Sequence, residues 1–158
     1  MKKFELTSEF VTFLGKKLFR IKALVSFGDV KEGELGGLVE KEENLDQSGN
    51  AWVYGDARVS GDARVYGDAR VYGNAWVSGD ARVQNCRDYS ATSCFGSENR
   101  TTTFFRTKDG GISVRCGCFY GTLNEFREKV KERHGDSRLA KEYLMLADLM
   151  EFRLSKDE

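Results

Sequence analysis

Residues 49–84 read GNAWVY-GDARVS-GDARVY-GDARVY-GNAWVS-GDARVQ, six hexads in unbroken succession. Each hexad carries Ala and Val two positions apart, so both side chains lie on one face of a short strand. Gly with Asp or Asn then supplies a bend, because these residues tolerate turns and positive φ angles. A period of six fits neither an α-helix nor simple strand alternation. The pattern predicts a solenoid of stacked coils with Ala and Val inside.

In each hexad Val is followed four places later by the Ala of the next hexad, and this repeats every six residues. The pattern resembles the hexapeptide repeat of left-handed parallel β-helices. In that family three hexads form one triangular coil of 18 residues, so the resemblance implies two coils over 49–84. The sequence departs from the family in one respect, because Tyr or Ser directly follows Val where the family often has Gly.

A coil of 18 residues predicts which side chains are neighbours, since parallel strands lie about 4.8 Å apart. It places Trp52 beside Arg70 and Arg58 beside Trp76. Each pair can form a cation–π contact worth about 0.5–1 kcal/mol at an exposed site. The hexads therefore predict two aromatic–cation ladders on the outside of the coil.

The outward side chains of the hexads form the candidate binding surface. The same period places Tyr54 beside Tyr72 and Arg64 beside Arg82, and the arginine pair is costly unless Asp62 or Asp80 screens it. Trp, Tyr and Arg dominate binding hot spots, so we expect a flat recognition surface. The alternative is that these ladder pairs only cover the outside of the coil. The candidate partner-binding residues are Trp52, Tyr54, Arg58, Arg64, Tyr66, Arg70, Tyr72, Trp76 and Arg82.

Residues 1–48 lack the hexad and predict an N-terminal β cap with a lead-in to the first coil. Phe4–Leu6 and Leu18–Val25 have strand character, with a turn at 15–17. The lead-in GGLVEKEENL, residues 36–45, resembles segments that precede the repeats in bacterial and prophage hexapeptide-repeat proteins. A cap is expected physically, because an open solenoid end exposes unpaired strand edges.

The hexads fade after residue 84, and the remainder predicts a ββαα cap. Tyr89 and Phe95 keep the six-residue spacing, which suggests an irregular third coil. Thr101–Lys108 and Ile112–Phe119 alternate as strands around an Asp-Gly-Gly turn, and this tail also resembles that of prophage hexapeptide-repeat proteins. A capping box at 122–125 opens one helix, and Asp136 or Ser137 opens a second. The expected fold is mainly β, with domains 1–48, 49–95 and 96–158.

The resemblance raises the question of enzyme activity, because many left-handed β-helix proteins are trimeric acyltransferases with a histidine base between coils. The base removes a proton from the attacking amine or hydroxyl. This chain has one histidine, His134, which lies outside the hexads. We therefore expect no enzyme, no catalytic residue and no cofactor.

The four cysteines are Cys86, Cys94, Cys116 and Cys118. A structural zinc site usually takes two close pairs of thiolates, and only Cys116 and Cys118 form such a pair. Thiols that pack as small apolar side chains are the favoured interpretation, and no metal is expected. A four-thiolate site at the junction of solenoid and cap stays open as the alternative.

Charge and hydropathy exclude some classes of function. Lys plus Arg number 25 and Asp plus Glu number 25, and this balance argues against a protein that binds by neutralising phosphates. Residues 85–121 are mildly basic with interleaved aromatics, which suggests nucleic acid only weakly. No run of about 18 apolar residues occurs, and the first ten residues carry acidic side chains where a signal peptide needs an apolar stretch. A cytoplasmic location in a bacterial host cell without membrane contact is expected.

These observations favour a non-catalytic interaction protein encoded by a phage or prophage. A rigid solenoid offers a preorganised surface, which lowers the entropic cost of binding. The expected partner is a host protein or ribonucleoprotein complex, and an anti-CRISPR-like inhibitor is one candidate role. One alternative is a self-assembling structural solenoid that forms homo-oligomers. Another is a trimeric hexapeptide acyltransferase, which the lack of a histidine in the repeats disfavours.

Overall fold

The hexads form six two-residue strands that pair in three separate parallel ladders. This computed structural model describes residues 2–95 and 100–155, without the side chains of Cys94, Phe95 and Arg100. In it Trp52 pairs with Arg70, which lies 18 residues later in the chain. The expected coil period is therefore confirmed. The ladders join β4 to β7, β5 to β8 and β6 to β9. The strands are β4 (Trp52–Val53), β5 (Arg58–Val59), β6 (Arg64–Val65), β7 (Arg70–Val71), β8 (Trp76–Val77) and β9 (Arg82–Val83).

The inside of the coil is a stack of small apolar side chains. Every Ala and Val of the hexads is at most 1% exposed, as the alternation predicts. The corners between strands turn at glycines, for example Gly61 with φ +64° and Gly73 with φ +71°. Because only glycine adopts this conformation without steric cost, it marks each corner.

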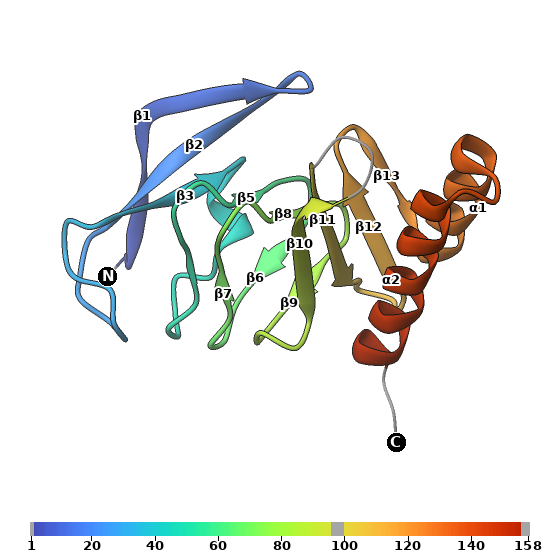
Figure 1. The fold of residues 1–158 in the computed structure, drawn as a ribbon. Coiled ribbons are helices and arrows are strands. Elements are labelled where there is room, and N and C mark those ends of the chain that lie inside the picture. Colours follow the sequence, from blue (N-terminus) through green and yellow to red (C-terminus); the bar gives the residue numbers. More distant parts are fainter. Residues whose placement is uncertain (1, 96–99, 156–158) are drawn as a thin grey trace.

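The N-terminal strands extend one ladder of the solenoid into a five-stranded sheet of order β1-β2-β3-β5-β8. They are β1 (Phe4–Phe13), β2 (Lys16–Ala23) and β3 (Leu35–Val39). The first strand is much longer than expected, and the turn lies at Leu14 and Gly15 rather than at 15–17. The long hairpin of β1 and β2 reaches over the solenoid toward the C-terminal part (Figure 1).

The lead-in caps the first coil through buried polar side chains. A short 3-10 helix, η1 (Glu42–Asn44), ends in Asn44, which is fully buried. The amide of Asn44 donates to the carbonyls of Gly61 (3.1 Å) and Ala63 (2.9 Å). The Lys3 ammonium donates to the carbonyl of Ala51 at 2.8 Å, and burial lowers the pKa of Lys3 to about 8. These contacts satisfy carbonyls that the open end of a solenoid would otherwise expose.

The C-terminal part is a four-stranded antiparallel sheet followed by two helices. Within the described residues 85–95 the expected third coil does not form, and β10 joins an antiparallel sheet instead. There the Asp88 carboxylate accepts hydrogen bonds from the backbone of Gln84 and Asn85 and turns the chain. The expected strand 112–119 is split in two by a tight turn at Gly117, φ +60°. The strands are β10 (Tyr89–Phe95), β11 (Arg100–Arg106), β12 (Ile112–Cys116) and β13 (Phe119–Thr122).

This sheet lies between the end of the solenoid and the two helices (Figure 1). On one face Tyr89 and Phe105 join the core of the solenoid, and on the other Phe104 and Val114 pack against the helices. The capping box of Thr122 and Glu125 forms as expected, and Ser137 caps the second helix. The helices are α1 (Leu123–His134) and α2 (Arg138–Leu154), and within the described residues no helix combines the length and apolarity needed to span a membrane.

Candidate interaction surface

The candidate binding residues are distributed over three ladders and do not form the flat surface expected from the sequence. Each coil has one strand in each ladder, so consecutive hexads necessarily face different directions. Arg58 and Trp76 share the first ladder, Trp52 and Arg70 the second, and Arg64 and Arg82 the third. The first ladder continues directly into the N-terminal sheet, so its exposure depends on the caps.

Trp76, on the first ladder, is covered by both caps and is only 6% exposed. The Phe13 ring from the β1–β2 hairpin packs against it edge-on, with centroids 4.8 Å apart. The Arg115 guanidinium from β12 lies 4.0 Å from the Trp76 ring, and that of Arg58 lies 5.7 Å away. The indole Nε1 donates to Ser60 Oγ at 2.7 Å. The expected contact of Arg58 with Trp76 is confirmed, but the ring holds the caps together and is hidden from a partner.

Trp52, on the second ladder, is fully buried, contrary to the expectation that it faces outward. Phe4 and Phe27 pack edge-on against its ring. The ring fits because residue 36 is glycine. A Cβ at that position would lie only 2.6 Å from the indole. The expected stacking of Arg70 on Trp52 is wrong, because the Arg70 guanidinium turns to Asp29 at 3.6 Å. The Gly-Gly pair of the lead-in was the sequence signal for this buried ring.

A surface that we call the tyrosine patch, made of Asp29, Tyr54, Arg70 and Tyr72, lies at the edge of the second ladder. The two tyrosine rings lie 6.1 Å apart, and Tyr72 is 56% exposed. The Tyr54 hydroxyl donates to Asp29 Oδ1 at 3.0 Å. Burial, reinforced by the Asp29 carboxylate, raises the pKa of Tyr54 to about 12, so the hydroxyl stays protonated at neutral pH. The patch thus offers two neighbouring rings, tilted by 48°, beside a guanidinium.

A second exposed surface, the arginine face, consists of Arg64, Tyr66 and Arg82 on and beside the third ladder. Arg82 Nη1 donates to the carbonyls of Asp62 (3.0 Å) and Ala81 (2.8 Å). Arg64 makes no hydrogen bond or ion pair with any residue that the structure describes. The Asp62 carboxylate binds Lys41 Nζ at 2.9 Å, and this hydrogen bond, with smaller contributions from the charges of Arg82 and Arg64, lowers the pKa of Asp62.

The arginine face forms one side of a groove of about 580 Å³. The lead-in continues the third ladder, because Leu45 bridges to Val65, so guanidinium groups and carboxylates line the same groove. Such a surface suits a ligand that carries both signs of charge. The groove is lined by Arg64, Val65, Tyr66, Arg82, Glu42, Glu43, Leu45, Asp46 and Gln47.

The remaining chemistry-bearing side chains are scattered. The His134 ring stacks on Tyr143 with centroids 5.7 Å apart, at the end of α1 and far from the hexads in the chain. Cys86 and Cys118 are exposed, and Cys116 contacts the Thr102 hydroxyl at 3.2 Å. The side chain of Cys94 lies outside the described residues. Across residues 2–95 and 100–155, no three His, Cys, Asp or Glu side chains gather as a metal site would require.

Comparison with known proteins identifies the repeat. A family model described as the YdcK beta-solenoid repeat matches residues 51–65 and 63–79. The match therefore spans 51–79 of the hexads and neither of the caps. No curated protein matches the chain.

Proposed function

We propose that the protein is a non-catalytic interaction protein of phage or prophage origin that binds a host macromolecule through the arginine face and the tyrosine patch. The observation that carries this proposal is Arg64, which lies beside Arg82 in the third ladder, lines the groove and makes no hydrogen bond or ion pair within the described residues. Two like charges in neighbouring strands repel each other unless a carboxylate screens them, and Asp62, which acts on both arginines, is shared with Lys41. An acidic group of a partner placed between them would convert this cost into a charge-assisted contact.

The charge pattern of the groove favours a protein as the partner. Glu42, Glu43 and Asp46 line it together with the two arginines. A nucleic-acid backbone presents only phosphates, which these carboxylates repel. A folded protein segment with an acidic residue and neighbouring basic or amide groups satisfies both sides. This supports a host protein, or the protein part of a ribonucleoprotein complex, as the target of an anti-defence inhibitor such as an anti-CRISPR.

The two alternative functions have less support. End-to-end stacking needs free solenoid ends, but the lead-in bonds to the first coil through Asn44, and at the other end Lys108 N bonds to Asp80 O at 2.8 Å. A trimeric acyltransferase needs a base between coils, and the hexads contain no histidine. We propose in addition that the solenoid is the left-handed kind that the resemblance implies, and that it acts in the host cytoplasm.

A capture experiment tests the proposal. The immobilised protein is incubated with bacterial host lysate, and bound proteins are identified by mass spectrometry. One variant removes the arginine face (Arg64→Ala, Tyr66→Ala, Arg82→Ala) and another the tyrosine patch (Tyr54→Ala, Arg70→Ala, Tyr72→Ala). A control variant removes exposed charges from α1 (Lys131→Ala, Arg133→Ala).

We expect a stoichiometric partner that the control retains and that the arginine-face variant loses, with affinity reduced about tenfold or more. Loss in the tyrosine-patch variant alone would place the site on the second ladder. Retention by both variants would contradict the proposal and move the site to the caps. Capture of no protein would leave self-assembly as the leading alternative.

A further inference from the structure

Helix α2 has an apolar stripe on its outer side that stays largely exposed. Met145, Leu149 and Phe152 are 71%, 56% and 85% exposed. Their spacing of four and three residues places them in one line along the helix. The opposite side of α2 is buried against the sheet and α1 through Tyr143, Leu146 and other residues. The helix is therefore apolar on two sides, which is typical of a helix with two packing partners.

Charged side chains with opposite signs and no partner flank the stripe. Glu142 and Arg153 are 11 residues apart, about three helical turns, so they lie on the same flank, beside Leu149. Both are exposed, and neither forms an ion pair or hydrogen bond within the described residues. On the other flank Asp148 and Glu151 are both held by Arg127 Nη2, at 2.8 and 2.7 Å. Only the Leu149 flank has unpaired charges of both signs.

The stripe and its charges share one centre. The midpoint of Glu142 and Arg153 lies between residues 147 and 148. The midpoint of the apolar stripe, from Met145 to Phe152, lies between residues 148 and 149. The two centres differ by one residue, about 1.5 Å along the helix axis. A two-fold axis through this point would pair an antiparallel copy of α2 with itself. Glu142 would then face the other copy's Arg153 twice, and the apolar stripes would meet.

We propose that α2 is a homodimer interface, in which the stripe packs antiparallel on the same stripe of a second copy of this chain. Such a patch is isologous, the arrangement that closed two-fold dimers require. It leaves the arginine face and the tyrosine patch free, so the dimer would present two copies of each. Binding of a partner with two sites would gain avidity from that arrangement.

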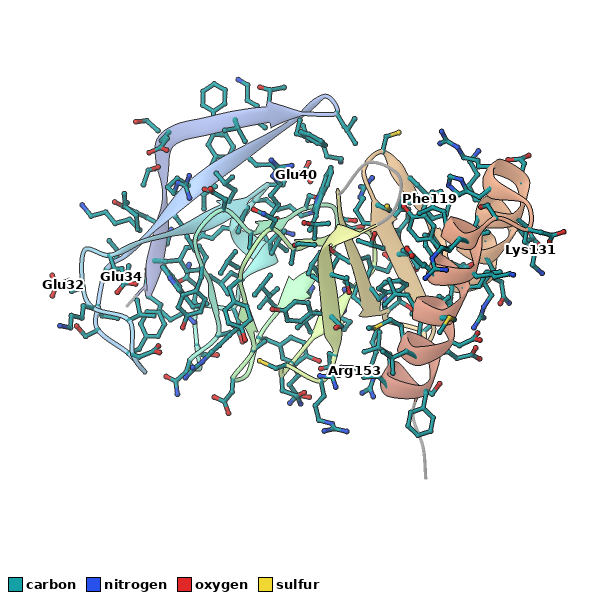
Figure 2. The ribbon with its side chains drawn as sticks, in the orientation of Figure 1. Glu32, Glu34, Glu40, Phe119, Lys131 and Arg153 are labelled. Carbon is teal, nitrogen blue, oxygen red and sulfur yellow. The ribbon has the colours of Figure 1, made fainter. Side chains whose placement is uncertain are left out.

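The surroundings of the stripe also favour an acidic side chain from the second copy. A groove of about 670 Å³ runs beside α2 and is lined by Leu149, Phe152 and three arginines. Arg106 is already bound to Asp88 at 2.9 Å, whereas Arg87 and Arg153 have no side-chain partner among the described residues. Figure 2 shows Arg153 at the C-terminal end of α2. Glu142 of the second copy would supply the missing carboxylate.

A lipid surface fits the stripe less well. Membrane-binding helices carry basic residues around the apolar face. Here the flank opposite Arg153 mixes Asp148 and Glu151 with Lys141, so the stripe lacks a basic rim on both sides. The stripe is also short, so the interface belongs to the small class that assembles weakly and reversibly.

Sedimentation velocity over a range of protein concentrations tests the proposal. The full chain should show a monomer–dimer equilibrium with a Kd on the order of tens of micromolar, as expected for a small interface. Phe152→Ser should weaken it about tenfold or more, because a buried aromatic anchor is lost. Lys131→Glu on α1 is the control and should leave the equilibrium unchanged. Circular dichroism melts check that each variant folds.

Charge reversal gives the decisive comparison. Glu142→Arg and Arg153→Glu should each weaken the dimer about tenfold, because both symmetric contacts become repulsive. The double variant should dimerise like the original chain, and an equimolar mixture of the two single variants should form a heterodimer. A chain that stays monomeric at high concentration overturns the proposal. So does a dimer that tolerates the single reversals, or one that the double reversal fails to restore.

Discussion

The first and third ladders of the solenoid are built from the same hexad and have opposite environments. In the first, Arg58 lies beside Trp76, and Phe13 and Arg115 from the two caps cover the ring. In the third, Arg64 lies beside Arg82 and faces an open groove. The repeat therefore determines register and the inward side chains, while the caps determine which outward side chains a partner can reach.

The strongest test of this difference is the removal of the covered ring. Trp76→Ala should reduce the free energy of unfolding by about 3–5 kcal/mol, because it empties a buried site shared by the coil and both caps. Tyr72→Ala, which removes an outward aromatic ring that stays 56% exposed, should cost about 1 kcal/mol or less. Urea denaturation followed by circular dichroism measures both. Similar losses in the two variants would show that the caps do not cover the first ladder as described.

The coil could be predicted from the sequence because each hexad repeats a local rule. The pairs Trp52–Arg70, Arg58–Trp76 and Arg64–Arg82 follow from the 18-residue period alone. The helical part of the C-terminal cap was also predictable, since the capping box at Thr122 is a local signal.

The exposure of the outward residues could not be predicted in the same way. Trp76 is buried by Phe13, which lies 63 positions earlier in the chain, and by Arg115, which lies 39 positions later. Contacts at such separation leave no periodic trace in the sequence. The length of β1 was missed for a related reason, because the strand passes through a polar stretch at 7–9, where the register with β2 is irregular, and continues through pairing of Phe10–Phe13 with Lys16–Phe19. The candidate site was thus predicted by residue type and revised by tertiary contacts.

A second prediction compares the corners that lead into the two ladders. Gly61, before the open strand β6, has φ +64°, and a Cβ there would lie 2.9 Å from the backbone nitrogen of Gly79. Gly73, before the covered strand β8, has φ +71° and no atom within 4 Å of such a Cβ. Gly73→Ala should therefore cost about 1–2 kcal/mol for the left-handed backbone alone. Gly61→Ala should lower the free energy of unfolding by more than this, because the corner at Gly61 must also move away from the corner at Gly79.

Thermal and urea denaturation of the two alanine variants measure this difference. Tighter stacking at Gly61 means that the first and third ladders meet at a rigid edge, which would hold Arg64 in place. An equal cost at the two glycines would contradict that view, since only the backbone conformation would then matter.

The smallest expected effect concerns the open ladder itself. Arg64→Gln removes one of two positive charges that neighbour each other in the ladder and should stabilise the free protein by about 0.2–0.5 kcal/mol. The matched change Arg70→Gln removes a guanidinium paired with Asp29 at 3.6 Å and should destabilise it slightly. The difference between the two variants should shrink at about 1 M salt, where charges are screened beyond roughly 3 Å. Chemical denaturation at low and high salt provides the measurement.

If Arg64→Gln raises the free energy of unfolding and Arg70→Gln lowers it, the two measurements would connect stability with function. A residue that lowers the stability of the free protein, yet whose removal abolishes capture of a partner, is typical of a binding site. Arg58→Gln on the covered ladder should behave differently from both, because its guanidinium packs on Phe13 at 4.5 Å and on Trp76. Its loss should destabilise the protein at any salt concentration, since packing rather than charge holds it. If Arg64→Gln also destabilised the protein independently of salt, the arginine face would be a structural ladder like the covered one.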